Sequence, residues 1–206
     1  MRAYVYVDGF NLYYRALRGT PNKWVNLLEV AKRLLNPDDT VEVVRYFTAR
    51  VRARAGDPDA PRRQQVYLSA LGSVPNIKFH YGSFLSKTKK RPLVSNGTFV
   101  EVHDTEEKGS DVNLAVHLVN DAWSQRFDVA LVLSQDTDLI EPMRIVSQER
   151  GLKVGLVWLD GKRPNPKLAN VATFTRHLSS ADLTASQFPS LIARTSGPVI
   201  QKPSGW

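Results

Sequence analysis

The chain contains no cysteine among its 206 residues. Without cysteine there can be no disulfide framework, no thiolate nucleophile and no zinc or iron–sulfur site built from thiolates. Long apolar runs are missing as well: no segment approaches the roughly 18 uninterrupted apolar residues that suggest a membrane-spanning helix. No apolar leader stretch follows Met1 and Arg2. We therefore expect a soluble, cytoplasmic protein with no membrane partner.

Acidic residues are fewer than basic ones. The 20 Asp and Glu residues against 28 Lys and Arg residues give a net charge of +8. Such a molecule attracts polyanions, so RNA, or alternatively DNA, is the first partner to consider. A hydrophobic content of 42% suits one domain with a sizeable core.

Apolar, strand-like segments alternate with segments of helical periodicity at the spacing of βαβ units. The expected strands are 3–7, 41–51, 77–81, 128–133 and 152–158, and the expected helices are 26–35, 62–71, 111–123 and 139–148. This order predicts an α/β fold whose mostly parallel sheet is covered by helices on both faces.

The remaining segments have weaker patterns. Residues 82–107 are expected to form a hairpin or a mobile excursion with a short strand at 98–102, and a further short strand is expected at 171–174. We assign residues 1–180 to the main domain and residues 181–206 to a partly irregular C-terminal extension. We expect the last ten residues to be loosely held.

Four aspartates occupy the ends of the expected elements. Asp8 follows the first strand, Asp136 and Asp138 follow the strand at 128–133, and Asp111 opens a helix. Ligands of parallel sheets bind beyond the carboxyl ends of the strands. Carboxylates gathered there repel one another unless a hard divalent cation takes oxygen ligands from each. The alternative is that each aspartate caps the helix that follows it.

Three blocks in this order resemble the signature of the NYN (LabA-like) branch of the PIN-like nucleases. They are VDGFNL at 7–12, EKGSDV at 107–112 and LSQDTDL at 133–139. The resemblance spans about residues 3–160. It implies a three-layer, Rossmann-like α/β/α fold, a Mg²⁺ or Mn²⁺ site, and hydrolysis of phosphodiester bonds, most often in RNA.

The resemblance also assigns roles to residues. The acidic positions of the family fall on Asp8, Asp111, Asp136 and Asp138, and its asparagine falls on Asn11. Asp8 and Asp136 would be direct metal ligands, while Asp111 and Asp138 would bind directly or through water, with one of them orienting the attacking water. Asn11 would add a neutral oxygen or hold a phosphate.

One position departs from the family pattern. Many members have Asp in the phrase Ala-Val-Asp-Leu, where this chain has His117. If that acid serves a second metal ion, this chain holds one ion or reacts slowly. His117 could instead donate a hydrogen bond to a metal ligand, or it could have a purely structural role. Asp121, one turn later, could replace the missing acid at the metal site, or it could be an ordinary solvated charge.

Basic side chains near an aromatic residue suggest where a single strand could bind. The first candidate segment holds Lys87, Lys89, Lys90 and Arg91, with Phe84 nearby. The second candidate is the arginine-rich stretch that contains Arg45, Arg50, Arg52, Arg54, Arg62 and Arg63. Either could be a solvated loop instead.

Two further residues are candidate substrate contacts. Lys108 could touch the scissile phosphate, or pair with Glu106 or Glu107. Ser134 is also a candidate, although it lacks a neighbouring base and is suited to bonding its own backbone.

These observations favour a metal-dependent ribonuclease, an endonuclease acting on single-stranded or loop RNA. A weakened RNA-binding module of the same fold and a Toprim-like phosphoryl-transfer enzyme are the alternatives. The sequence leaves homo-oligomerisation open.

Overall fold

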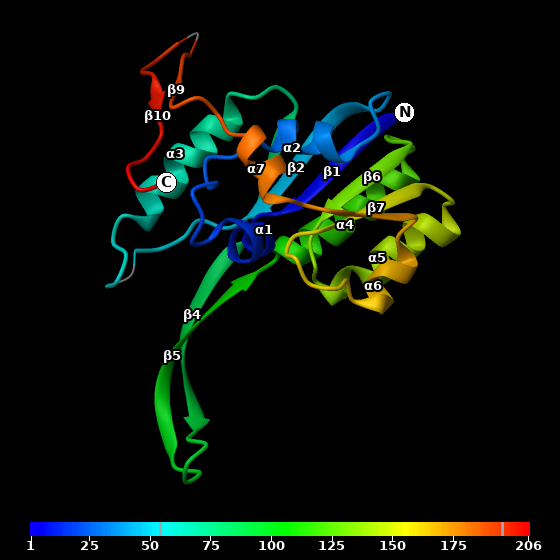
Figure 1. Ribbon diagram of the computed structural model, residues 1–206. Helices are drawn as coiled ribbons and strands as arrows, with labels where there is room; N and C mark the ends of the chain where they lie inside the picture. Colours follow the sequence, from blue (N-terminus) through cyan, green and yellow to red (C-terminus); the bar gives the residue numbers. More distant parts are fainter. Residues whose placement is uncertain (54, 195) are drawn as a thin grey trace.

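The computed structural model describes residues 1–53, 55–194 and 196–206. Its centre is a six-stranded sheet in the order β3-β2-β1-β6-β7-β8, in which every neighbouring pair is parallel (Figure 1). The strands are β1 (Arg2–Asp8), β2 (Thr40–Thr48), β3 (Ile77–Tyr81), β6 (Val129–Leu133), β7 (Lys153–Trp158) and β8 (Phe174–His177). The predicted α/β class and parallel sheet are confirmed.

Helices cover both faces of this sheet. One side carries α1 (Gly9–Leu12), which continues as a π-helical turn at Tyr13–Leu17, together with α2 (Leu27–Leu34) and α3 (Ala60–Gly72). The other side carries α4 (Ser110–Trp123), α5 (Ile140–Arg144) with a π-helical turn at Ile145–Glu149, and α6 (Pro166–Val171). The architecture is therefore the three-layer α/β/α arrangement.

The central strands are buried on both faces because alternate side chains enter different cores. In β1, Val5 and Val7 pack with the helices of the first side, whereas Tyr6 packs with those of the second. In β6, Leu131 and Val132 divide in the same way. This explains why these strands read as continuous apolar runs in the sequence.

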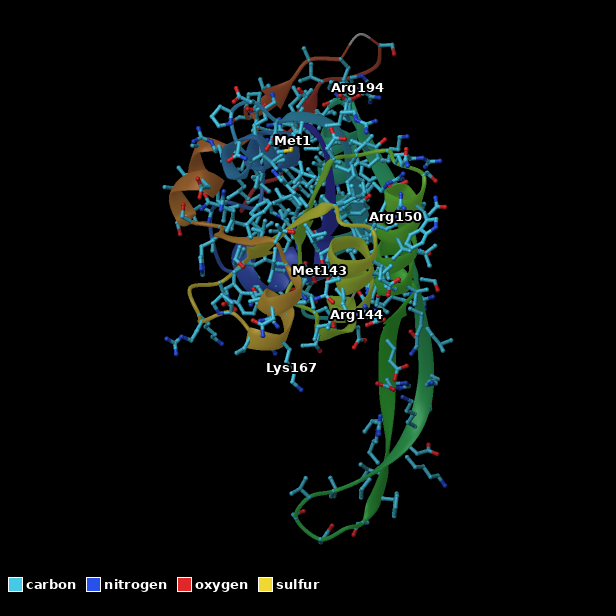
Figure 2. The ribbon with its side chains drawn as sticks, turned by 90° about the vertical axis from the view of Figure 1, so that its right-hand side faces the viewer. Met1, Met143, Arg144, Arg150, Lys167 and Arg194 are labelled. Carbon is cyan, nitrogen blue, oxygen red and sulfur yellow. The ribbon has the colours of Figure 1, made fainter. Side chains whose placement is uncertain are left out.

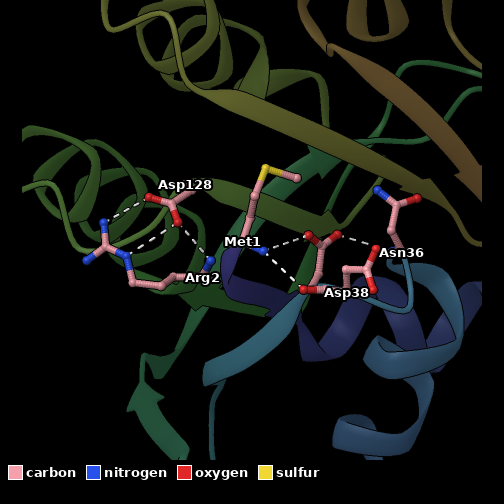
Figure 3. Close-up of polar contacts among 6 residues, drawn as sticks. Met1, Arg2, Asn36, Asp38 and Asp128 are labelled. Atoms are coloured by element: carbon pink, nitrogen blue, oxygen red, sulfur yellow. Dashed lines mark hydrogen bonds and ion pairs between the residues drawn. The ribbon is translucent and has the colours of Figure 1, made fainter.

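The amino-terminal edge of the sheet is held by polar contacts (Figure 3). The Met1 ammonium donates to the carbonyl oxygen of Asp38 at 3.1 Å and lies 3.3 Å from Oδ1 of Asp39. The Arg2 guanidinium pairs with Asp128 at 2.9 Å. These contacts fix β1 beside β2 and β6 at the end of the sheet opposite to the carboxyl ends.

A long hairpin interrupts the alternation between β3 and α4. Strands β4 (Ser83–Pro92) and β5 (Phe99–Lys108) pair in continuous antiparallel register. The hairpin stands away from the body, with side chains on both of its faces (Figures 1 and 2). The expectation of a short strand ending at residue 102 is therefore wrong, and the pairing extends to Lys108.

The C-terminal segment packs onto the first side of the molecule. It contains α7 (Ser180–Ala185), β9 (Leu191–Ile192) and β10 (Ile200–Gln201). Ile200 is buried, and the Trp206 ring lies 5.6 Å from that of Tyr67 and 6.3 Å from that of Trp24. The expectation of a loosely held C-terminus is wrong for these residues, while the division of the chain at residue 180 stays a prediction.

Candidate active site

The first strand delivers an aspartate to the carboxyl-end rim of the sheet. Asp8 is the last residue of β1, and Val7 before it pairs with Leu133, the last residue of β6. Asp8 is 4% exposed, and its Oδ1 accepts a hydrogen bond from the backbone N–H of Asn11 at 2.9 Å. Asp8 therefore caps α1 and lies on the rim at the same time.

Ser134 connects Asp8 to the second acidic segment. Its hydroxyl donates to Oδ2 of Asp8 at 3.0 Å and accepts from the backbone N–H of Asp136 at 3.2 Å. Asp136 in turn accepts from the backbone N–H of Asp138 at 2.9 Å. Ser134 is fully buried, so the substrate contact expected for it is wrong. Its position is between the two carboxyl-bearing segments.

Asn11 and Gln135 fix the loop after β6. The side-chain oxygen of Asn11 accepts from the backbone N–H of Gln135 at 3.1 Å, and Oε1 of Gln135 accepts from the backbone N–H of Leu159 at 3.0 Å. The amide oxygen of Asn11 thus bonds to the protein, and its NH₂ group is the part suited to a phosphate. In the sequence, only its place in the third block marks Gln135.

The hairpin returns the chain to the same rim and so places Asp111. Ser83 pairs with Lys108 at the base of the hairpin, and the backbone N–H of Gly82 bonds to the carbonyl of Thr48 at 2.8 Å. A Cβ atom on Gly82 would lie 2.6 Å from the carbonyl oxygen of Lys108. This close approach requires glycine, and it sets the start of α4 with Asp111 in its first turn.

The electrostatics show that the acids share one neighbourhood. Burial, followed by the negative charges of Asp8, Asp136, Glu107 and Asp138 in that order, raises the pKa of Asp111 to about 6. Burial also raises the pKa of Asp8, against the effect of its hydrogen bonds from Asn11 and Ser134. The four expected aspartates are therefore brought together on one rim.

Glu107 is a further acidic member of this neighbourhood, in addition to the four expected aspartates. Its carboxylate accepts from the backbone N–H of Ser110 at 3.2 Å and from the Ser110 hydroxyl at 2.5 Å, and so it caps α4. Asp111 therefore does not have to cap its own helix. Its place in the second block, four residues before Asp111, is the sequence feature that could have identified Glu107 as part of the site.

Hydrogen bonds to backbone N–H groups at the starts of helices orient the carboxylates of Asp8, Asp136 and Glu107. Within residues 1–53, 55–194 and 196–206, no set of three or more His, Cys, Asp or Glu side chains is positioned so that it could hold a metal ion.

Lysines of the hairpin are largely engaged with acids of the same hairpin. Lys89 pairs with Asp104 and with Glu106, the latter at 2.6 Å, and Lys87 lies 3.9 Å from Glu106. Lys108 pairs with Glu106 at 2.9 Å. Hydrogen bonds from Lys89 and Lys108 lower the pKa of Glu106 to about 2. The surface that holds Lys87 and Lys89 is thus a neutralised ladder and not the free basic patch that was expected.

The acidic residues of the hairpin offset most of its positive charge. In the hairpin register Lys90 lies opposite Glu101, and Arg91 lies opposite Val100. Residues 83–108 contain five basic and four acidic side chains. The hairpin therefore carries one of the chain's eight net positive charges.

Arg45, the first residue of the second basic segment, is buried and so is not available to bind a nucleic-acid strand. It is 5% exposed and pairs with the fully buried Asp121, with Nε at 2.6 Å and Nη2 at 2.9 Å. Tyr6 donates to the same carboxylate at 2.8 Å, and Arg126 contacts it at 2.9 Å. Asp121 is thus a buried structural acid, and the expectation of solvated charge is wrong.

His117 belongs to this interior network. Its ring lies 4.0 Å from that of His80, and Nε2 of His80 is 3.1 Å from Nη1 of Arg45. Burial, followed by the charge of Arg45, lowers the pKa of His117. These contacts support the structural interpretation of His117.

The remaining arginines lie in and beside the loop after β2. The Arg50 guanidinium stacks 5.0 Å from the ring centre of Tyr81 and contacts Gln65, and Arg63 pairs with Asp57. Arg52 contacts Ser86 of the hairpin at 3.4 Å. Arg54 lies outside the described residues.

Comparison with known proteins finds one matching protein family and a related protein. The model of the NYN domain matches residues 2–181. The chain is 30% identical over 241 residues to the 6-hydroxy-3-succinoylpyridine 3-monooxygenase HspA of Pseudomonas putida (strain DSM 28022 / S16), covering 100% of this chain and 75% of that relative.

A solved structure shares the fold. It is the crystal structure of a protein of unknown function from Vibrio parahaemolyticus RIMD 2210633, with a TM-score of 0.53 and 16% identity over 87% of this chain and 93% of that chain. Among the residues described, no helix is long and apolar enough to cross a membrane. The extent of the family match, over nearly the whole chain, decides the assignment: the chain belongs to the NYN domain family, part of the PIN-like nuclease superfamily.

Proposed function

We propose that this protein is a metal-dependent ribonuclease that hydrolyses phosphodiester bonds within single-stranded or loop RNA. The observation that carries the proposal is the approach of Asp8, Asp136 and Asp138, at the carboxyl ends of the neighbouring strands β1 and β6, to Asp111 at the start of α4. Ser134 is bonded to both Asp8 and Asp136. Membership of a nuclease superfamily supports it.

The oxygen chemistry of these side chains suits a hard divalent cation, although their present positions form no ligand cluster within the described residues. Asp8 is almost fully buried, and among the described residues none of the four aspartates forms an ion pair with a basic side chain. Buried carboxylates without a counter-charge are unfavourable in their ionised form, as the raised pKa of Asp8 indicates. Mg²⁺ or Mn²⁺ would supply that charge and accepts oxygen ligands.

Each residue then has a role. Mg²⁺ or Mn²⁺, when bound, neutralises charge on the phosphate and lowers the pKa of a coordinated water. Asp8 and Asp136 would hold the ion, with Ser134 fixing the first carboxylate. Asp111 and Asp138 would bind it directly or through water and orient the attacking water. The NH₂ group of Asn11 would hold a phosphate oxygen.

A substitution at the centre of this set tests the proposal. Asp136→Asn should lower metal-dependent cleavage of a labelled single-stranded RNA by at least about a hundredfold, because it removes a charged ligand from the ion. RNA binding should persist or improve, since one repelling charge is gone. Asp38→Asn, at the opposite end of the sheet (Figure 3), is the matched control and should cleave normally.

The same assay includes the outcomes against the proposal. Equal cleavage by Asp136→Asn and the parent in Mn²⁺ would place any activity elsewhere. RNA binding without cleavage by the parent in either ion would favour the weakened binding module.

The name of the 30% identical relative supports a second candidate, monooxygenation of a hydroxypyridine ring. In that reaction one oxygen atom of O₂ enters the ring and the other leaves as water, with two electrons from a reductant. Oxygen uptake with 6-hydroxy-3-succinoylpyridine and NADH, stoichiometric with hydroxylated product, would support it. Cleavage of RNA without such uptake would reject it.

A further inference from the structure

We propose that a cavity at the base of the β4–β5 hairpin binds an unpaired base of the RNA strand, with Phe84 as the stacking surface. This inference rests on the proposed function and names the substrate contact beside the acidic rim. The cavity has a volume of about 170 Å³ and is lined by Val51, Arg52, Ala53, Phe84, Ser86 and Thr105.

The two faces of the hairpin have different chemistry. Alternate residues of a strand face opposite sides, so the ion-paired residues Lys87, Lys89, Asp104 and Glu106 share one face. The cavity opens on the other face, where Phe84, Ser86 and Thr105 lie between Glu107 at the base and the Lys90–Glu101 register pair further out. Among the described residues, the charged side chain of the cavity wall, Arg52, forms no ion pair that a ligand would have to break.

The cavity offers an aromatic surface and polar edge groups together. Phe84 is partly exposed. The hydroxyls of Ser86 and Thr105 lie 3.3 Å apart, and Nη1 of Arg52 lies 3.4 Å from the Ser86 hydroxyl. A flat heteroaromatic ring that stacks on Phe84 could therefore bond at its edge to hydroxyl and guanidinium groups. Nucleobases in single strands are recognised by this combination.

Phe84 is also next to the acidic rim from two directions. It pairs in register with Glu107, which neighbours Asp111 electrostatically. Its ring packs edge-on against that of Phe10 at 5.6 Å, and Phe10 is two residues after Asp8. A base on Phe84 would thus place its own phosphates near the carboxylates.

The aromatic surface continues along the rim and is accompanied by guanidinium groups. The Phe10 ring stacks on Tyr14 at 6.5 Å, and Tyr14 is 51% exposed with the Arg18 guanidinium 5.6 Å from its ring. Arg52 lies in the cavity wall. In a single strand, successive bases could stack on such a row of aromatic rings while the phosphates lie near the guanidinium groups. This arrangement favours a single strand as the ligand over an isolated small ring.

Binding can be measured separately from cleavage. In an Asp136→Asn background, fluorescence anisotropy with a labelled ten-nucleotide single-stranded RNA would compare Phe84→Ala, Phe84→Trp and the control pair Lys87→Ala with Lys89→Ala. We expect Phe84→Ala to weaken binding by about fivefold or more, because stacking on the aromatic ring is lost. Phe84→Trp and the control pair should stay within about twofold of the parent.

A second variant leaves the hairpin itself unaltered. Arg52→Ala should weaken binding, because the base loses its guanidinium partner in the cavity, and it should flatten the slope of log affinity against log salt, because one positive charge beside the strand is lost. The inference is overturned if Phe84→Ala and Arg52→Ala both bind like the parent, or if the lysine pair loses more affinity than Phe84→Ala.

Two outcomes separate this inference from the proposed function. Metal-dependent cleavage by the parent chain, with binding unaffected by Phe84→Ala, overturns the inference alone. Absence of RNA binding and cleavage in every variant contradicts the proposed function as well. If 6-hydroxy-3-succinoylpyridine quenches the added tryptophan of Phe84→Trp and RNA does not, the cavity serves a small ring instead of a strand.

Discussion

At the residue scale, the acidic rim concentrates like charges that the fold only partly compensates. Hydrogen bonds from Asn11 and Ser134 support Asp8, and Glu107 supports the start of α4. Asp111 lies in the first turn of α4 and is not its N-cap residue, and its pKa is raised to about 6. The rim therefore suits a bound cation. Without a cation, repulsion between its carboxylates lowers the stability of the fold.

That imbalance gives a pH-dependent prediction for Asp111→Asn. Because the folded-state pKa lies above the ordinary value of 3.8, the folded chain binds a proton more tightly than the unfolded chain. The free energy of unfolding without metal should then fall as the pH rises from about 4 to about 6. Allowing for its partial exposure, Asp111→Asn should be more stable than the parent by about 1–2 kcal/mol at pH 7.

Urea denaturation in EDTA between pH 4 and pH 8 would measure this difference. The difference between the two proteins should shrink toward pH 4, where Asp111 is protonated in the folded chain and about half protonated in the unfolded chain. Added Mg²⁺ should stabilise the parent more than the variant. Equal stability of the two proteins across the whole range would contradict the electrostatic account of the rim.

At the element scale, the hairpin positions the site by returning the chain to the place where it left. Ser83 and Lys108 pair directly, so α4 starts at the rim whatever the length of the excursion between them. Gly82 allows this return, because its backbone lies against Lys108. The elements that position Asp111 are therefore the first residues of β4 and the last residues of β5.

A methyl group at this crossing should disturb the site. In Gly82→Ala the new Cβ would meet the Lys108 carbonyl at 2.6 Å and the Ser110 backbone nitrogen at 3.1 Å, which requires backbone movement. We expect a loss of about 1–3 kcal/mol in unfolding free energy and a fall in cleavage measured well below the melting temperature. Gly161→Ala, where the new Cβ meets nothing within 4 Å, is the control. Normal cleavage by Gly82→Ala would mean that Asp111 needs no such placement.

How far the sequence predicted these elements depended on the kind of signal. The strands that end at Asp8 and Leu133 are predictable because apolar runs bounded by polar residues report burial directly. The strand at 77–81 also has its predicted bounds, although it is only partly buried and alternates apolar with polar residues. The length of the hairpin was missed because its strands carry charges on both faces. The pairing of Arg45 with Asp121 was missed because a buried ion pair has no sequence pattern of its own.

At the scale of the whole molecule, one hydrophobic core lies on each side of the sheet, and the two cores support different parts of the fold. The core beneath α4 and α5 includes Met143 near the centre of the body (Figure 2) and supports the helix that carries Asp111. The core beneath α2 and α3 extends to the C-terminal segment through Trp24, Tyr67 and Trp206. The second of these closes the fold on the side away from α4.

Trp206 should consequently affect stability and not chemistry. Its ring is partly buried against Trp24 and Tyr67, so Trp206→Ala removes aromatic packing and should lower the free energy of unfolding by about 2–3 kcal/mol. Trp123→Ala is the matched control, because Trp123 is 54% exposed on α4 with the Arg150 guanidinium over its ring. It should lose less than about 1 kcal/mol. Denaturant titration of both variants, with cleavage assayed at a temperature where each is folded, measures the two effects. Equal destabilisation by both substitutions would mean that the last residues do not belong to the core, and lost cleavage in folded Trp206→Ala would connect this core to the rim.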